Sequence, residues 1–174
     1  MAATSGALAA ADPPDTRRIG AALDRAHHLA QTGLQDARRA IGTLRDEELP
    51  GPRRLAGLAR EFERDSGVGC HLEVTGERRE LGSQARLAVY RTAQEALTNV
   101  RKHAHAQRVE LRLGYERDGT RLTVEDYAPD GVPAAGDGDG YGLAGMRERA
   151  ELLDGTLTAA PTGTGFRVEL WVPA

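Results

Sequence analysis

The sequence predicts an α/β (α+β) two-layer sandwich, in which helices back one face of a mixed or antiparallel sheet, preceded by one long helix. Two patterns support this prediction. Before residue 50, apolar residues recur at the spacing of a helix, whereas beyond residue 69 strand-like alternation is interleaved with helical segments. The length of 174 residues suits one domain plus an appendage.

The first fifty residues form the predicted appendage. Residues 1–14 are expected to be a disordered start, because they lack the basic and strongly apolar regions of a signal peptide. Residues 15–50 are predicted to form a helix with one apolar stripe, which consists of Ile19, Leu23, Ala26, Ala30, Leu34, Ala37, Ile41 and Leu44. A stripe rich in alanine suits close packing, so this segment is expected to belong to a helical hairpin or dimer.

Residues 51–174 form the predicted α/β domain. Pro50 and Pro52 are placed as stop and restart signals between the two parts of the chain. In chain order, the predicted elements are a helix to about Asp65, the strand CHLEVTG, a helix from Gln84 to His105, the strands RVELRLGY and RLTVED, a helix from Leu143 to Leu153, and the strands TLTAA and FRVELWV.

The composition excludes several classes of function. The formal net charge of -3 argues against a general binder of nucleic acid or anionic membranes, because both partners attract a basic surface. Cys70 is the only cysteine, which excludes an internal disulfide framework and a cysteine-cluster metal site. We expect it to be a small core residue. No apolar run approaches the roughly 20 residues that cross a bilayer, so a cytoplasmic location is expected.

The segment EALTNVRKHAHA places a carboxylate, an amide and an ammonium on one predicted helix. Asn99 and Lys102 are the only asparagine and the only lysine of the chain. At about 100° per residue, Glu95, Asn99 and Lys102 share a face opposite the apolar residues. An ordinary amphipathic helix also has a polar face. However, Asn has poor helix propensity, and this mixture of groups suits a divalent cation with nucleotide phosphates.

The two histidines of this segment do not form a predicted metal site. His103 and His105 are two residues apart, so their rings point to different sides of a helix, and no HExxH-type partner is nearby. Near a helix end, a histidine is more often a surface residue or a favourable charge at the C-terminal dipole than a ligand.

Two segments further along the chain complete the candidates. Strand alternation places Asp126 on the side of Leu122 and Val124, where a buried carboxylate needs a donor such as an adenine amine. A turn-starting aspartate is the alternative. A glycine-rich stretch then leads into a helix, where backbone N–H groups can approach an anion, although such a stretch is more often a flexible connector. Its glycines are Gly136, Gly138, Gly140, Gly142 and Gly145.

Together and in this order, these residues resemble the ATP-binding domain of sensor histidine kinases. The sequences QEALTNVRKHA and GLAGMRERAELLDG are typical of the nitrate-sensor and DesK-like subfamily. The resemblance covers residues 55–174 and implies the ATPase fold shared with DNA gyrase, a mixed sheet backed by helices. The matching motifs are Glu95-x-x-x-Asn99-x-x-Lys102-His103-Ala104, Asp126 after a strand, Gly140-x-Gly142-Leu143-x-Gly145-Met146, and Gly163-Thr164-Gly165-Phe166.

The resemblance implies a role for each candidate on the helix and the strand. Asn99 would hold a Mg2+ ion that bridges the ATP phosphates, and Lys102 with His103 would contact phosphate. Glu95 would take a proton from the attacking histidine. Asp126 would accept a hydrogen bond from the adenine amine. The implied chemistry is phosphoryl transfer by positioning and charge neutralisation.

The resemblance also assigns the glycine-rich segments. Residues 128–141 would form a mobile lid over the nucleotide, and Thr164 would support the adenine side. The residues expected to bind ATP at the end of the lid and directly after it are Gly140, Gly142, Leu143 and Gly145.

Two departures from the family pattern are visible. The first glycine box of the family reads Asp-x-Gly-x-Gly, whereas Ala128 and Asp130 occupy the glycine positions here. A methyl group and a carboxylate at these positions would weaken nucleotide binding through sterics and repulsion. His27 and His28 lack the acid that follows the acceptor histidine of the family, and LQDARRAIGTLR looks like the second helix of the dimerising hairpin. We therefore expect the chain to begin after the acceptor.

Three hypotheses for the function follow. The leading one is the ATP-binding catalytic region of a bacterial two-component sensor kinase, either a cytoplasmic protein or the cytoplasmic part of a membrane-bound one. The full protein is expected to form a homodimer. Its implied partners are the acceptor-histidine helix and a response regulator. The alternatives are a nucleotide-binding pseudokinase without phosphotransfer, which Ala128 favours, and a serine-kinase anti-sigma factor on the same fold, which the leading helix disfavours.

Overall fold

The computed structural model describes residues 50–128 and 141–174, except for the side chain of Tyr141. The predicted start at 1–14, the predicted helix at 15–50 apart from Pro50, and residues 129–140 of the predicted lid, among them Gly140, lie outside these residues. The described elements are η2 (Pro52–Arg54), α2 (Leu55–Ser66), β1 (Gly69–Thr75), α3 (Ser83–His103), β2 (Arg108–Tyr115), β3 (Gly119–Tyr127), α4 (Tyr141–Glu151), β4 (Thr156–Pro161) and β5 (Phe166–Pro173).

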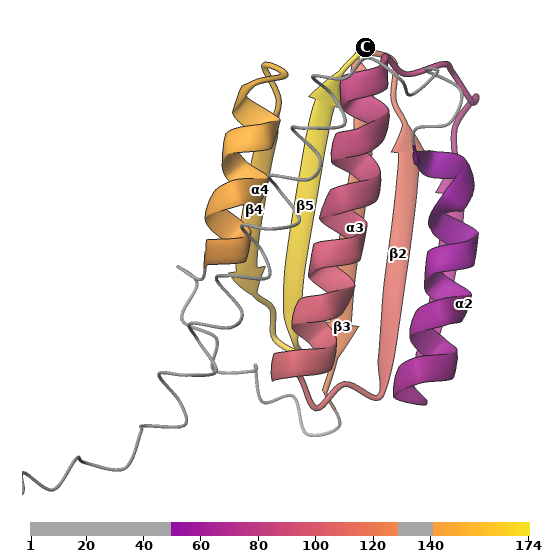
Figure 1. The fold of residues 1–174 in the computed structure, drawn as a ribbon, viewed down its shortest axis with the longest axis vertical. Helices are drawn as coiled ribbons and strands as arrows, with labels where there is room; N and C mark the ends of the chain where they lie inside the picture. The colour runs from indigo at the N-terminus through magenta and orange to yellow at the C-terminus, as the bar shows by residue number, and fades with distance from the viewer. Residues whose placement is uncertain (1–49, 129–140) are drawn as a thin grey trace, which may run out of the picture. The chain divides into compact units, whose positions relative to one another are not determined.

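The strands form one five-stranded mixed sheet in the order β1-β2-β3-β5-β4. β1 is parallel to β2 and the other neighbours are antiparallel. A parallel pair needs a crossover connection, and α3 supplies it between β1 and β2. Helices α2, α3 and α4 all lie on the same face of the sheet (Figure 1). The structure therefore confirms the predicted two-layer α/β sandwich.

Two predicted helix ends are wrong by two residues. Helix α3 ends at His103, not at His105, because Ala104 takes an extended conformation with φ -100° and ψ 141°. Helix α4 ends at Glu151, not at Leu153. The N–H groups of Leu153 and Asp154 donate to carbonyls three residues earlier, and Asp154 has φ 53°. These two turns stop the helical pattern before the apolar spacing does.

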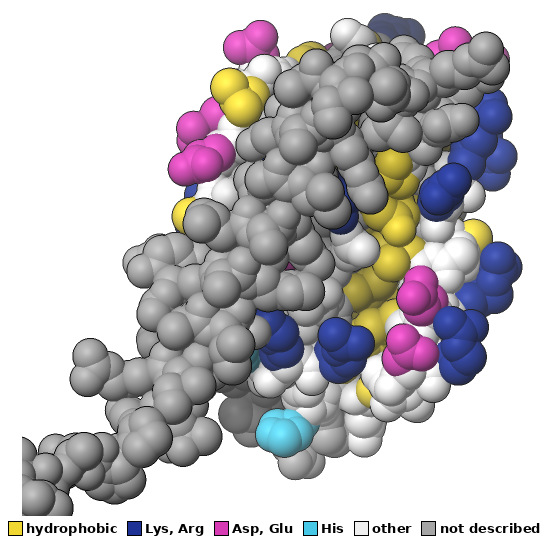
Figure 2. Space-filling model, in the orientation of Figure 1, with side chains coloured by type: hydrophobic (Ala, Val, Ile, Leu, Met, Phe, Trp, Pro, Cys, Tyr) yellow, Lys and Arg dark blue, Asp and Glu magenta, His cyan; other side chains and the backbone are white. Residues whose placement is uncertain are grey.

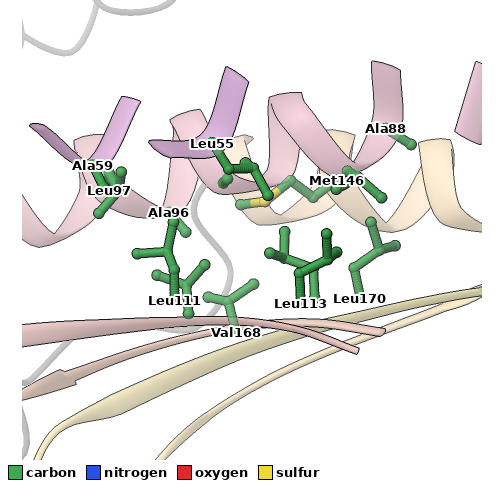
Figure 3. Packing of buried hydrophobic residues seen from close by; sticks show 14 of the residues in the cluster. Leu55, Ala59, Ala88, Ala96, Leu97, Leu111, Leu113, Met146, Val168 and Leu170 are labelled. Atoms are coloured by element: carbon green, nitrogen blue, oxygen red, sulfur yellow. The ribbon is translucent and has the colours of Figure 1, made fainter. Parts of the chain in front are cut away.

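The hydrophobic core lies between the sheet and the three helices. Figure 3 shows Leu111 and Leu170, from β2 and β5, pointing toward the helices, where Leu55, Leu97 and Met146 meet them. Cys70 is also buried in this core, as predicted. Its burial, with the charge of Glu63, raises the pKa of the thiol to about 12, which keeps it protonated at neutral pH.

The two surfaces of the sandwich differ in character. From the helix side, Figure 2 shows a stripe of hydrophobic side chains between α3 and α2, bordered by charged groups. The face of the sheet without helices carries ion pairs, among them Arg121 with Glu169 at 2.5 Å and with Glu116 at 2.7 Å. No described helix is long and apolar enough to cross a membrane.

Candidate functional site

The segments that carry the predicted site residues end at the same end of the sheet. Helix α3 is followed after four residues by β2, and the first strand residues of β2 pair with the last residues of β3, for example Val109 with Asp126. A hydrogen bond of 2.8 Å from the Gln107 N–H to the Tyr127 carbonyl extends this pairing. Figure 1 shows the end of α3 and the start of β5 at the lower end of the view, with the start of α4 farther up beside α3.

Two further contacts join the remaining segments to this end. The N–H of Ala128, directly after β3, donates to the carbonyl of Thr164 in the turn between β4 and β5, at 2.8 Å. Gly142, at the start of α4, lies beside the Glu95 carboxylate of α3. The structure therefore brings together all four segments that the sequence singles out, Gly140 and the lid excepted.

The polar residues of α3 lie in different environments along one helical face. Glu95, Asn99 and Lys102 are spaced four and three residues apart on a continuous α-helix, so they share a face. Glu95 and Asn99 are half-buried, whereas Lys102 and His103 are exposed at the last turn. Cations at a helix C-terminus complement its dipole, so Lys102 and His103 also have a favourable structural position.

The structure gives a steric reason for a glycine at position 142. A Cβ atom at this position would lie 2.6 Å from Oε1 of Glu95, so any side chain would displace the carboxylate. The glycine thus lets Glu95 lie directly against the start of α4. Its neighbour Leu143 is 7% exposed and belongs to the hydrophobic core, so only the backbone of Leu143 is available to a ligand.

Asp126 is a buried acid without a full set of partners. It is 4% exposed, and its register opposite Val109 places it on the core face, as the alternation predicts. Among the described residues its Oδ1 has no hydrogen-bond partner. Burial raises the pKa of Asp126, while the Phe166 backbone N–H lowers it and Glu125 raises it. Strand β3 continues for one residue beyond Asp126, to Tyr127.

Gly165 closes the space around Asp126. A Cβ atom at Gly165 would lie 2.0 Å from the Asp126 backbone oxygen and 2.7 Å from its Oδ1. The motif Gly163-Thr164-Gly165 therefore needs its second glycine because the backbone of β3 occupies that space. In contrast, a Cβ at Gly163 would meet nothing within 4 Å. The side chain of Thr164 is exposed, while its carbonyl holds Ala128.

The donor set at this end suits a nucleotide better than a protein-only metal site. Within the described ranges, no three His, Cys, Asp or Glu side chains gather to hold a metal ion. An unpaired buried carboxylate oxygen fits an amine donor, and the amide of Asn99 with the ammonium of Lys102 fits a divalent cation and phosphates. A metal ion here would need oxygen ligands from phosphate or water.

Arg149 is absent from the predicted site residues, although it lies close to them. It is half-buried on α4, and burial lowers the pKa of its guanidinium, while the charge of Glu95 raises it. The sequence contains one signal for it. Arg149 follows Gly142 by seven residues, so both lie on the same side of α4, next to the buried Met146 and Ala150.

The comparisons with known proteins point to one family. Residues 84–174 match the family described as histidine kinase-, DNA gyrase B-, and HSP90-like ATPase. The chain is 36% identical over 146 residues to the signal transduction histidine-protein kinase/phosphatase UhpB of Salmonella typhimurium, covering 81% of this chain and 29% of that protein. It is 32% identical over 148 residues to the sensor histidine kinase YxjM of Bacillus subtilis, covering 83% and 36%.

A solved structure agrees with this match. The histidine kinase domain of a blue-light activated histidine kinase from Erythrobacter litoralis aligns with a TM-score of 0.55 and 25% identity, covering 68% of this chain and 58% of that one. The chain spans about a third of the length of the two curated relatives, so the similarity concerns one region of longer proteins.

Proposed function

Because the chain belongs to the histidine kinase-, DNA gyrase B-, and HSP90-like ATPase family, we propose that it binds Mg2+ and ATP and transfers the γ-phosphoryl group to a histidine on a partner helix. Use of ATP and the place of the chain as the ATPase domain of a sensor histidine kinase follow from that membership and from the curated relatives. The metal, the residue roles and the acceptor are the finer parts of the proposal.

The observation that carries the proposal is the unpaired Oδ1 of the buried Asp126 carboxylate. A buried acceptor without a donor costs roughly 1–3 kcal/mol, so a chain that keeps one gains when a ligand supplies the donor. The exocyclic amine of adenine is such a donor. Gly165 leaves no room for a protein side chain that would take its place. We therefore assign the adenine end of the site to Asp126, with Thr164 beside it.

The phosphate end of the proposed site is the last three turns of α3. Asn99 would be the protein ligand of Mg2+, and a bound Mg2+ ion supplies charge that neutralises the β- and γ-phosphates. Lys102 and His103, exposed at the helix end, would contact phosphate oxygens. Backbone groups at Gly142 and Gly145, and at Gly140 outside the described residues, would approach the same phosphates.

The proposed reaction transfers a phosphoryl group from oxygen to nitrogen. An imidazole nitrogen of the acceptor attacks the γ-phosphorus, the bond from this phosphorus to the bridging oxygen breaks, and ADP leaves with the electron pair. Glu95, half-buried beside α4, accepts the proton that the imidazole N–H loses. The response regulator would then take the phosphoryl group from the histidine, and the full protein would act as a homodimer.

Titration calorimetry of the chain with ATP, with and without Mg2+, tests the site. We expect binding that depends on Mg2+ and that Asn99→Ala abolishes while leaving the thermal unfolding midpoint unchanged. Gln84→Ala is the matched control, because it removes an exposed amide at the other end of α3, about 22 Å along the helix. Equal affinity in Asn99→Ala and wild type would refute the assignment of the metal ligand.

A pseudokinase is the second candidate, and Ala128 favours it. This residue stands at a glycine position of the family box, and its N–H is already committed to the Thr164 carbonyl. Transfer of labelled phosphate from ATP to an acceptor-helix fragment of the relative UhpB separates the two candidates. Label on the acceptor supports the kinase, whereas tight binding of ATP without transfer supports the pseudokinase.

A further inference from the structure

Helix α4 approaches the Glu95 side chain at Gly142 and carries an arginine, Arg149, that has no role in the proposed nucleotide site. At its first turn, the missing side chain of Gly142 leaves the space that Oε1 of Glu95 occupies. Two turns later, Arg149 comes from the same side of α4. Glu95 is the leading opposite charge that acts on Arg149, ahead of Glu148.

Arg149 is also an unusual arginine in this chain. Its Nε is buried and has no hydrogen-bond partner within the residues that the structure describes. Burial lowers the pKa of Arg149, and the neighbouring Arg91 lowers it further, so its position costs free energy unless an anion compensates. An arginine that served only solubility would extend into solvent, as Arg60 does on α2.

We propose that α4 positions Glu95 for proton transfer, with Gly142 leaving the space for the carboxylate and Arg149 supplying the opposite charge. The proposal rests on the proposed function of Glu95 as the proton acceptor. Gly142 and Arg149 are positioning residues, because neither is assigned to the reacting atoms in this role. This arrangement connects α4, which follows the predicted lid in the chain, to the face of α3 that carries the proposed phosphate-binding residues.

Two other charged groups lie near Glu95 and Arg149. Arg91 lies one turn earlier, but its Nη1 donates to Oε1 of Gln94 at 2.6 Å. The exposed Glu148 lies next to Arg149 in the chain, and its effect on Arg149 is smaller than that of Glu95. Arg91 on α3 and Glu148 on α4 are therefore the other charges that act on Arg149.

A thermal-unfolding cycle on the chain without nucleotide tests this link directly. We expect Glu95→Gln to lower the Tm by about 3 °C when Arg149 is present and by less than about 1 °C in the Arg149→Met background. Arg60→Met serves as the matched control, because it removes an exposed arginine from α2 and should leave the Glu95→Gln shift at its full size. Equal shifts in both backgrounds would overturn the proposal.

Label transfer to the acceptor-helix fragment tests the consequence for catalysis. Arg149→Met is expected to lower kcat about tenfold with KM for ATP unchanged within about twofold, and Arg149→Lys to recover most of the loss. Gly142→Ala favours the helix but displaces the Glu95 carboxylate, so it should lower kcat several-fold. The loss in the double variant Arg149→Met with Gly142→Ala should be smaller than the product of the single losses.

The possible outcomes separate the two proposals. If the wild type neither binds ATP nor transfers label, the proposed function fails, while the thermal cycle still decides the link between Arg149 and Glu95. A rise in KM equal to the fall in kcat/KM would overturn the inference by placing Arg149 in ATP binding. If Arg149→Met does not fold, kcat is measured on Gly142→Ala and Arg149→Lys instead. A wild-type kcat in Gly142→Ala would then overturn the inference.

Discussion

Glu125 and Asp126 are neighbours on β3, are 3% and 4% exposed, and face opposite sides of the sheet. On the open face, Arg167 meets the Glu125 carboxylate with three hydrogen bonds of 2.9–3.1 Å. On the core face, one oxygen of Asp126 has no partner among the described residues. Two similarly buried acids therefore differ in their partners: the carboxylate of Glu125 is paired within the fold, and Oδ1 of Asp126 is the atom that we propose a ligand pairs with.

The surroundings of the two acids make the same contrast. The open face offers long arginine side chains that reach across neighbouring strands. At Asp126, in contrast, the neighbouring position is Gly165, which has no side chain to offer. Burial alone does not distinguish these two acids, whereas the unpaired Oδ1 of Asp126 does, and our proposal rests on that difference.

The largest expected effect comes from filling the space beside Asp126. Gly165→Ala would place a Cβ 2.0 Å from the backbone oxygen of Asp126, and the sheet would have to shift. We expect a loss of about 3 kcal/mol in the free energy of unfolding and a parallel loss of ATP affinity. Gly163→Ala should have little effect on either, because its Cβ would meet nothing within 4 Å. Urea unfolding of both variants measures the difference, and equal stability would contradict the crowding.

The next effect tests the two acids against each other by ligand affinity. Asp126→Ala removes the proposed acceptor of the adenine amine and is expected to weaken ATP binding by about 2 kcal/mol, or roughly thirtyfold. Glu125→Ala changes a neighbour of similar burial on the other face, and its ATP affinity should stay within about twofold of wild type. Calorimetry on both variants is the measurement. Similar losses in the two would remove the distinction drawn here.

A smaller effect tests the ion pair of Glu125 with Arg167 through the free energy of unfolding. Arg167→Met leaves the buried Glu125 carboxylate without its ion pair, and we expect a loss of about 1.5 kcal/mol in unfolding free energy. This figure is below that of a fully buried pair because the Arg167 side chain is 46% exposed. ATP affinity should not change. A variant as stable as wild type in chemical denaturation would show that the pair contributes nothing to folding.

The smallest expected effect concerns pH. Since burial raises the pKa of Asp126, its contribution favours the folded chain while the carboxyl is protonated and is lost as pH rises through the folded-state pKa. Asp126→Asn removes the charge and should be more stable than wild type by about 1 kcal/mol at pH 7. That difference should shrink as the pH falls toward the ordinary value of 3.8. Thermal melts across this range would disprove the sign if the gap widened in acid.

Local periodicity was sufficient for much of the fold and part of the site. Alternation in β3 correctly put Asp126 on the core face, and helical spacing correctly put Glu95, Asn99 and Lys102 on one face of α3. The roles of these residues stay proposals. The helix ends at His103 and Glu151 were missed, because turns of a few residues ended each helix inside a pattern that still looked periodic.

The residues that sequence reasoning missed are those defined by distant neighbours. Nothing near Arg149 in the chain indicates that Glu95, 54 positions earlier, is the acid that acts on it. Gly142 and Gly165 were singled out by their motifs, but only the structure shows what each lies against, the Glu95 carboxylate and the backbone of Asp126.

The sequence by itself determined the class of the fold, the face on which each polar residue of α3 and β3 lies, and the resemblance to sensor histidine kinases, because each depends on local spacing or on motif order. Only the tertiary structure decided which charged and hydrogen-bonding groups pair with each other. Three features arise between segments far apart in the chain: the ion pair of Glu125, the unpaired oxygen of Asp126 and the contact of Glu95 with α4. Their energies depend on burial and distance, and no local pattern specifies either.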